Sequence, residues 1–65
     1  MIITVKAARV NAGMSQQEVA NALKMSVNTY AKKENGTTKF YVDEIAKISK
    51  LFNISIENFF ESSVS

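Results

Sequence analysis

The chain contains no cysteine, no histidine, no proline and no tryptophan among its 65 residues. Without cysteine, neither a disulfide framework nor a thiolate metal site can form. Without histidine, the commonest general base and the commonest zinc ligand are missing. The sequence also lacks a glycine-rich phosphate loop and an acidic cluster with the spacing of metal ligands. We therefore expect no enzymatic activity, no catalytic residues, no bound metal and no cofactor.

Long apolar runs are also missing. No segment approaches the roughly 20 residues that a membrane-spanning helix needs. The N-terminal sequence MIITVKAARV has neither a long apolar stretch nor a small-residue cleavage site. A chain of this length holds one domain whose core is barely sufficient. We expect a single cytoplasmic domain over residues 1–65, with no membrane or small-molecule partner and with residues 61–65 as a frayed tail.

The net charge of +2 hides an uneven distribution. Residues 1–39 carry six cationic and two acidic side chains, a net charge of +4, whereas residues 40–65 have a net charge of −2. The first part could attract a polyanion such as nucleic acid. An ordinary solvated surface would show the same distribution, so charge alone leaves both interpretations open.

The sequence predicts an all-α domain of five short helices, since it has two glycines and no convincing alternation of polar and apolar residues. Thr4, Ser15, Ser26 and Ser55 are suitable N-caps, and SQQE at 15–18 is a capping box. Gly13, Gly36 and Asn53 are suitable left-handed helix ends. The expected helices span about residues 4–12, 16–23, 26–35, 42–52 and 56–60.

Helices this short are marginal in isolation and must share one core. In residues 42–52, Val42, Ile45, Ile48 and Phe52 recur at the spacing of one buried face, with Leu51 beside them. The cluster of Asp43, Glu44 and Lys47 is interpreted as a solvated face. The expected core contains Val5, Ala8, Val19, Ala20, Leu23, Met25, Tyr30, Ile45, Ile48, Phe52, Ile54 and Phe59.

Residues 16–35 form a capped helix, a break of about three residues and a second helix with a polar outward face. This arrangement is typical of a helix-turn-helix, whose second helix can enter a DNA major groove. Tyr30 at the centre of that helix could stack on a base, but its spacing favours the core.

The chain resembles the single-domain helix-turn-helix proteins of the lambda-type phage repressor and Cro group. The resemblance covers about residues 4–60, through AARVNAGMSQQEVANAL, MSVNTYAKKENG and EIAKISKLFNISIENFF. It implies a compact lambda-repressor-like domain that binds double-stranded DNA. Two positions depart from the family pattern: Lys24 stands where glycine is most frequent in the turn, and Lys33 stands at a usually apolar core position. We expect the Lys33 stem to cover Tyr30 with its ammonium in water.

The resemblance also implies roles for individual residues. Asn28 could pair with adenine, Lys32 with guanine or a phosphate, and Val27 with a thymine methyl group, although a merely solvated Asn28 remains open. Lys6 could add sequence-independent attraction. Arg9 and Glu34 match a pair that joins the first and third helices, a structural role. The implied base contacts are Gln16, Val27, Asn28, Thr29 and Lys32, and the implied phosphate contacts are Ser15, Ser26, Asn35, Thr37, Thr38 and Lys39.

The function that follows is a sequence-specific transcriptional regulator, most simply a repressor, that binds a palindromic operator as a symmetric homodimer. Ile56, Phe59 and Phe60 could form the dimer surface, or they could complete the monomer core. The alternative function is a protein-interaction module, antitoxin-like or a co-regulator, because a fold does not fix a function.

Overall fold

The computed structural model describes residues 3–59 of the chain. It contains four α-helices and a final 3-10 turn: α1 (Val5–Asn11), α2 (Gln16–Ala22), α3 (Val27–Glu34), α4 (Val42–Phe52) and η1 (Ile56–Phe59). The described residues include no strand, so the all-α prediction is confirmed. None of these helices has the length and apolar character that crossing a bilayer requires.

The prediction of a fifth α-helix over residues 56–60 is wrong. The segment is a single 3-10 turn, in which the Asn58 N–H donates to the Ser55 carbonyl at 3.0 Å. Four residues are too few for repeated α-helical hydrogen bonds, and such short pieces adopt the tighter i→i+3 pattern. The Ser55 hydroxyl donates to the Glu57 carboxylate at 2.9 Å. Residues 60–65, including the expected tail, lie outside the described residues.

The first three α-helices begin where the sequence predicts. The side chains of Thr4, Ser15 and Ser26 accept hydrogen bonds from amides three residues further on, at 3.0, 3.1 and 3.1 Å. Glu18 completes the capping box by accepting from the Ser15 amide at 2.8 Å. These local hydrogen bonds satisfy backbone donors that a helix leaves unpaired at its start.

A residue with left-handed backbone conformation follows each α-helix. It comes after one intervening residue at the ends of α1, α2 and α3, and directly after α4. These residues are Gly13 (φ 71°), Lys24 (φ 59°), Gly36 (φ 90°) and Asn53 (φ 57°). A left-handed residue lets the chain turn while the last carbonyls of the helix still accept hydrogen bonds. Lys24 has a Cβ atom, so the left-handed conformation costs it roughly 1 kcal/mol that glycine would not lose.

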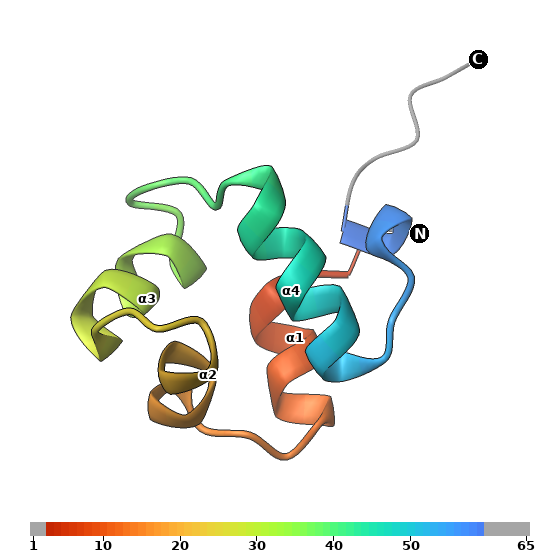
Figure 1. Ribbon diagram of the computed structural model, residues 1–65, viewed down its shortest axis with the longest axis horizontal. Coiled ribbons are helices and arrows are strands. Elements are labelled where there is room, and N and C mark those ends of the chain that lie inside the picture. Colours follow the sequence, from red (N-terminus) through yellow and green to blue (C-terminus); the bar gives the residue numbers. More distant parts are fainter. Residues whose placement is uncertain (1–2, 60–65) are drawn as a thin grey trace.

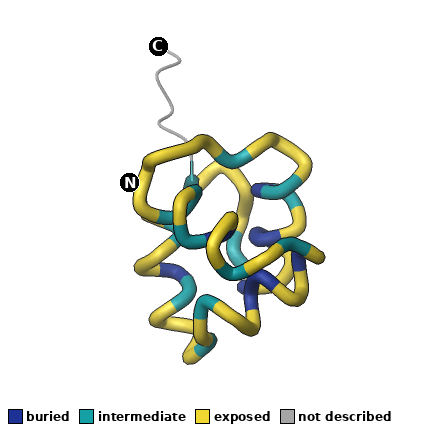
Figure 2. Tube along the Cα trace, turned by 90° about the vertical axis from the view of Figure 1, so that its left-hand side faces the viewer, coloured by how far each residue is buried: buried dark blue, intermediate teal, exposed yellow. Residues whose placement is uncertain are grey.

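The helices enclose one small core. Helix α2 packs on α3, while α4 packs against both α1 and η1 (Figure 1). Buried positions occur on all four α-helices, and much of the remaining trace is exposed (Figure 2). The buried apolar residues are Ala8, Val19, Ala20, Leu23, Tyr30, Ile45, Ile48 and Phe52, all of which the sequence predicts. Val5, Met25, Ile54 and Phe59 pack against them and are partly buried, as are Ile3, Met14, Val27 and Phe40.

The buried face of α4 is shorter than its apolar pattern predicts. Val42 is 72% exposed and Leu51 is 37% exposed, so the prediction that Val42 belongs to the buried face is wrong. Val42 is the first residue of α4, beside the exposed loop that follows α3, and core packing begins one turn later at Ile45. Ser49 is buried instead, and its hydroxyl donates to the Ala46 carbonyl at 2.7 Å.

Lys33 and Glu44 also differ from the prediction. The Lys33 side chain is 8% exposed and its Nζ lies 3.0 Å from Glu44 Oε1, so its ammonium does not stay in water. Glu44 is 15% exposed and is not part of a solvated face. The physical reason is that each charge has found a partner of opposite sign, without which neither could be buried.

Candidate nucleic-acid interface

Helix α3 presents a polar outward face. Asn28, Thr29 and Lys32 are exposed, whereas Tyr30 is completely buried. Asn28 and Lys32 are four residues apart, which puts their side chains on the same side of the helix. No ion pair involves Lys32 within residues 3–59, so its ammonium is free for a ligand there. The face therefore offers one amide, one hydroxyl and one cation.

Tyr30 anchors α3 to the rest of the domain. Its ring lies 5.9 Å from that of Phe40, centroid to centroid, with the planes tilted by 59°. Its hydroxyl donates to Glu34 Oε2 at 2.6 Å. The structure therefore assigns Tyr30 to the core and leaves it unavailable for stacking on a base.

The Glu34 carboxylate is the centre of a network that joins α1, α2 and α3. Arg9 Nε lies 2.8 Å from Glu34 Oε2, and Arg9 Nη2 donates to Oε1 at 3.3 Å. The Gln16 amide nitrogen donates to the same Oε1 at 2.9 Å. Arg9 Nη1 also donates to the Met14 carbonyl at 2.8 Å, which fixes the connection between α1 and α2. The network holds the C-terminal end of α3 in a defined place.

The network shifts the pKa values of its members. Burial works to raise the pKa of Glu34, but the hydrogen bonds from Arg9, Tyr30 and Gln16 outweigh it, so the pKa falls below its usual value. The hydrogen bond to Glu34 raises the pKa of Arg9. Burial, and then the same carboxylate, raise the pKa of Tyr30. Glu34 is therefore ionised at neutral pH, while Arg9 is cationic and Tyr30 is neutral.

Two of the expected base contacts are less open than the resemblance implies. Val27 is partly buried and packs against the core, so only part of its side chain is available. Gln16 is partly buried and uses one amide hydrogen on Glu34. Its carbonyl oxygen and second amide hydrogen remain for another partner. No sequence signal reveals this contact, because the two residues are 18 positions apart.

The loop after α3 contains several expected phosphate contacts, and they are already organised. Asn35 Oδ1 accepts from both the amide and the hydroxyl of Thr37, at 3.0 and 2.7 Å. The Thr38 amide donates to the Lys32 carbonyl at 3.2 Å. Lys39 is exposed. Ser15 and Ser26 are exposed at the starts of α2 and α3, where they act as caps.

The expected dimer residues are only partly placed. Ile56 is 36% exposed, whereas Phe59 is partly buried and packs on the core. Phe60 lies outside the described residues. Of the three expected dimer residues, only Ile56 is an exposed apolar residue within the described range.

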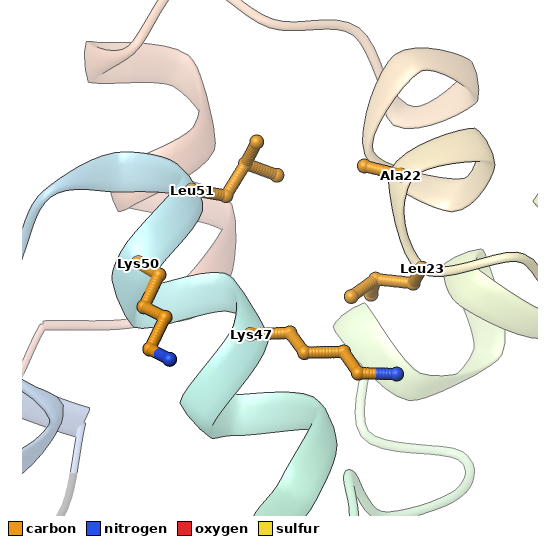
Figure 3. Close-up of a pocket in the computed structure, with 5 residues that line it drawn as sticks. All are labelled: Ala22, Leu23, Lys47, Lys50 and Leu51. Atoms are coloured by element: carbon orange, nitrogen blue, oxygen red, sulfur yellow. The ribbon is translucent and has the colours of Figure 1, made fainter.

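A separate hollow of about 350 Å³ lies between α2 and α4 (Figure 3). Its lining contains none of the expected DNA contacts and consists of Ala22, Leu23, Lys47, Lys50 and Leu51. Among residues 3–59 there is no group of three or more acidic side chains that could hold a metal ion. The hollow is therefore separate from the candidate interface on α3.

Comparison with protein families matches residues 5–59 to the helix-turn-helix family. The match covers most of the chain and includes α2, the turn at Lys24 and α3. The chain belongs to this family, in the branch of the lambda repressor and Cro proteins, which is a class of DNA-binding regulators. No curated protein and no solved structure gave a significant match.

Proposed function

We propose that the protein is a sequence-specific regulator of transcription, acting as a repressor, that inserts α3 into the major groove of double-stranded DNA. The observation that carries the proposal is the exposed set of Asn28, Thr29 and Lys32 on a helix whose opposite side is fixed by the buried Tyr30. A rigid helix with projecting polar side chains is the element that such proteins place against base edges.

The side chains define the expected readout. Asn28 can donate to N7 and accept from N6 of adenine, and Lys32 can donate to guanine O6 or N7 or to a phosphate. Thr29 can contact either kind of base, while the free part of Val27 can contact a thymine methyl group. Gln16, held by Glu34, would reach the DNA through its remaining polar atoms.

Sequence-independent contacts would come from both sides of α3. Lys39 and the amides and side chains of its loop would meet phosphates on one side, and the start of α2 would meet them on the other. The proposed phosphate contacts are Ser15, Ser26, Asn35, Thr37, Thr38 and Lys39. They set the position of the domain on the duplex, and the residues on α3 set the sequence.

One copy of α3 reads only a few base pairs, so we further propose a symmetric homodimer on a palindromic operator. Two copies related by a two-fold axis would read half-sites about 34–36 Å apart. The exposed Ile56, with Phe59 and Phe60, is the proposed contact. Sedimentation equilibrium with and without DNA tests this. An Ile56→Asp variant that dimerises like the unmodified protein would count against the contact.

Selection of bound sequences from a random DNA pool tests the proposal as a whole. We expect an enriched palindrome whose binding weakens steeply with salt, with a log–log slope of about −0.9 per neutralised phosphate. A pool without enrichment would reject sequence-specific binding. If a protein partner is then found whose binding hardly responds to salt, the protein-interaction function takes its place.

A further inference from the structure

Lys33, in the last turn of α3, makes three contacts through its ammonium. Its Nζ lies 3.0 Å from Glu44 Oε1, donates to the Lys39 carbonyl at 3.2 Å, and lies 4.3 Å from the centre of the Tyr41 ring. Its side chain is only 8% exposed. All of these partners follow Lys33 in the chain: Lys39 lies in the loop that leaves α3, Tyr41 lies at its end, and Glu44 lies in the first turn of α4.

These contacts link the two ends of the loop between α3 and α4. Glu44 Oε1 accepts from Lys33 and also from the Tyr41 amide, the latter at 2.8 Å. One carboxylate oxygen and one ammonium therefore tie the end of α3 to the start of α4. Between them lie Thr37, Thr38 and Lys39, three of the proposed phosphate contacts. Figure 1 shows this loop leaving the helical body as an extended connection.

The ammonium cannot itself be a DNA contact. The Lys33 side chain is only 8% exposed, and a carboxylate, a carbonyl and an aromatic face already contact its ammonium. An apolar side chain could fill the same space, but it could not donate to the Lys39 carbonyl. A buried ion pair also adds little net stability compared with apolar residues of similar size. What a lysine adds at this position is a hydrogen bond that fixes the loop backbone at Lys39.

We propose that Lys33 is a positioning residue for DNA binding, which holds the backbone at Lys39 so that residues 37–39 meet a phosphate in a preformed arrangement. The inference rests on the proposed DNA-binding function. A loop ordered before binding loses less conformational entropy when the complex forms. Lys33 thus acts through Lys39 and its neighbours and does not touch the DNA.

The test compares Lys33→Met with Lys47→Met, which removes the same charge from an exposed position on α4. Binding is measured on the operator selected from the random pool. We expect Lys33→Met to lose about tenfold in affinity, and to make the salt slope less steep by about 0.9 for each lost phosphate contact. Lys47→Met should change both much less. Thermal unfolding shows whether Lys33→Met still folds. Glu44→Gln is a second, milder variant that weakens the contact between Lys33 and Glu44.

A double-mutant cycle with Lys39→Ala separates positioning from general destabilisation. In the unmodified protein Lys39→Ala should weaken binding, whereas in the Lys33→Met background it should have little further effect. Full additivity of the two changes, or operator binding by Lys33→Met equal to that of Lys47→Met, would overturn the inference and leave the DNA-binding function standing. An unmodified protein that binds no DNA would overturn both.

Discussion

Arg9 in α1 and Glu34 in α3 form a direct ion pair, with Nε and Oε2 2.8 Å apart. Their side chains are 12% and 3% exposed. The same carboxylate also accepts from Tyr30 and Gln16, so one acidic group sets the relation between the first three helices. Charges this deeply buried are stable only while their partners remain in place.

Replacing Glu34 with alanine should destabilise the domain strongly, because it leaves the Arg9 guanidinium buried without its partner. We expect a loss of about 3 kcal/mol in the free energy of unfolding. The measurement is thermal or urea unfolding followed by circular dichroism. Asp43→Ala removes the same charge from an exposed position and should have little effect. Equal losses in the two variants would mean that the Glu34 network contributes no special stability.

The lowered pKa of Glu34 predicts a loss of stability in acid. A carboxyl group whose folded pKa lies below its unfolded value stabilises the protein above the unfolded pKa, and this contribution is lost as the pH falls through the folded pKa. The usual pKa of the group is 4.5, so stability should fall from about pH 4.5 downwards. Unfolding free energies measured between neutral pH and acid should fall less steeply for Glu34→Gln. A slope unchanged in that variant would assign the acid sensitivity to other carboxyl groups.

Tyr30→Phe removes only the hydroxyl that donates to Glu34 at 2.6 Å. Hydrogen bonds to charged groups contribute about 1.5–3 kcal/mol, so a loss of about 2 kcal/mol in unfolding free energy is expected. Tyr41 is 67% exposed, and Tyr41→Phe is the matched control that should remain close to the unmodified protein. Operator affinity should stay the same in Tyr30→Phe wherever the protein is folded. A selective loss of binding would contradict the core assignment.

Lys24→Gly should stabilise the domain, because glycine adopts the left-handed φ of 59° without a steric penalty. Relief of about 1 kcal/mol is partly offset by the greater freedom of glycine in the unfolded chain, which leaves a gain of about 0.5 kcal/mol. Urea midpoints measure the change. Ala22→Gly, at the last residue of α2, should instead destabilise the domain by up to about 1 kcal/mol. Both variants falling in stability would show that the turn imposes no strain on Lys24.

Asn28→Ala and Lys32→Ala should each weaken operator binding by about tenfold or more, since one good base contact gives about 1–3 kcal/mol of discrimination. Binding isotherms on operator and scrambled DNA measure the loss, and circular dichroism checks that the helices persist. Lys50→Ala, on α4, removes an exposed cation from outside the proposed interface. If both α3 variants bind the operator like the Lys50 variant, then α3 does not read the sequence.

The local features of the fold could be predicted from the sequence because their causes lie within a few residues. The caps at Thr4, Ser15 and Ser26 depend on amides three positions away. The left-handed ends at Gly13, Gly36 and Asn53 depend on the residue itself. The prediction for α4 failed at Val42, where the apolar spacing continues but the core does not.

The contacts that shape the candidate interface could not be predicted in the same way. Gln16 meets Glu34 across 18 positions, and Lys33 meets Glu44 across 11 positions and a loop. All four residues are polar, so in the sequence they cannot be told from solvated surface residues. Their partners come together only when the helices pack. The family resemblance implied the Arg9–Glu34 pair and placed Lys33 at a usually apolar core position, but it did not indicate that Glu44 would pair with the Lys33 ammonium.

The left-handed glycines at the ends of α1 and α3 also have open space around them, since nothing lies within 4 Å of a Cβ added at Gly13 or Gly36. The chain has no native thiol. A cysteine introduced at either glycine could therefore carry one fluorescent label, at a backbone cost of about 1–2 kcal/mol. A label at Gly36 would stand beside the loop that contains Thr37, Thr38 and Lys39, and one at Gly13 would stand where α1 passes into α2, so the two labels would report on the approach of a nucleic acid to two different loops.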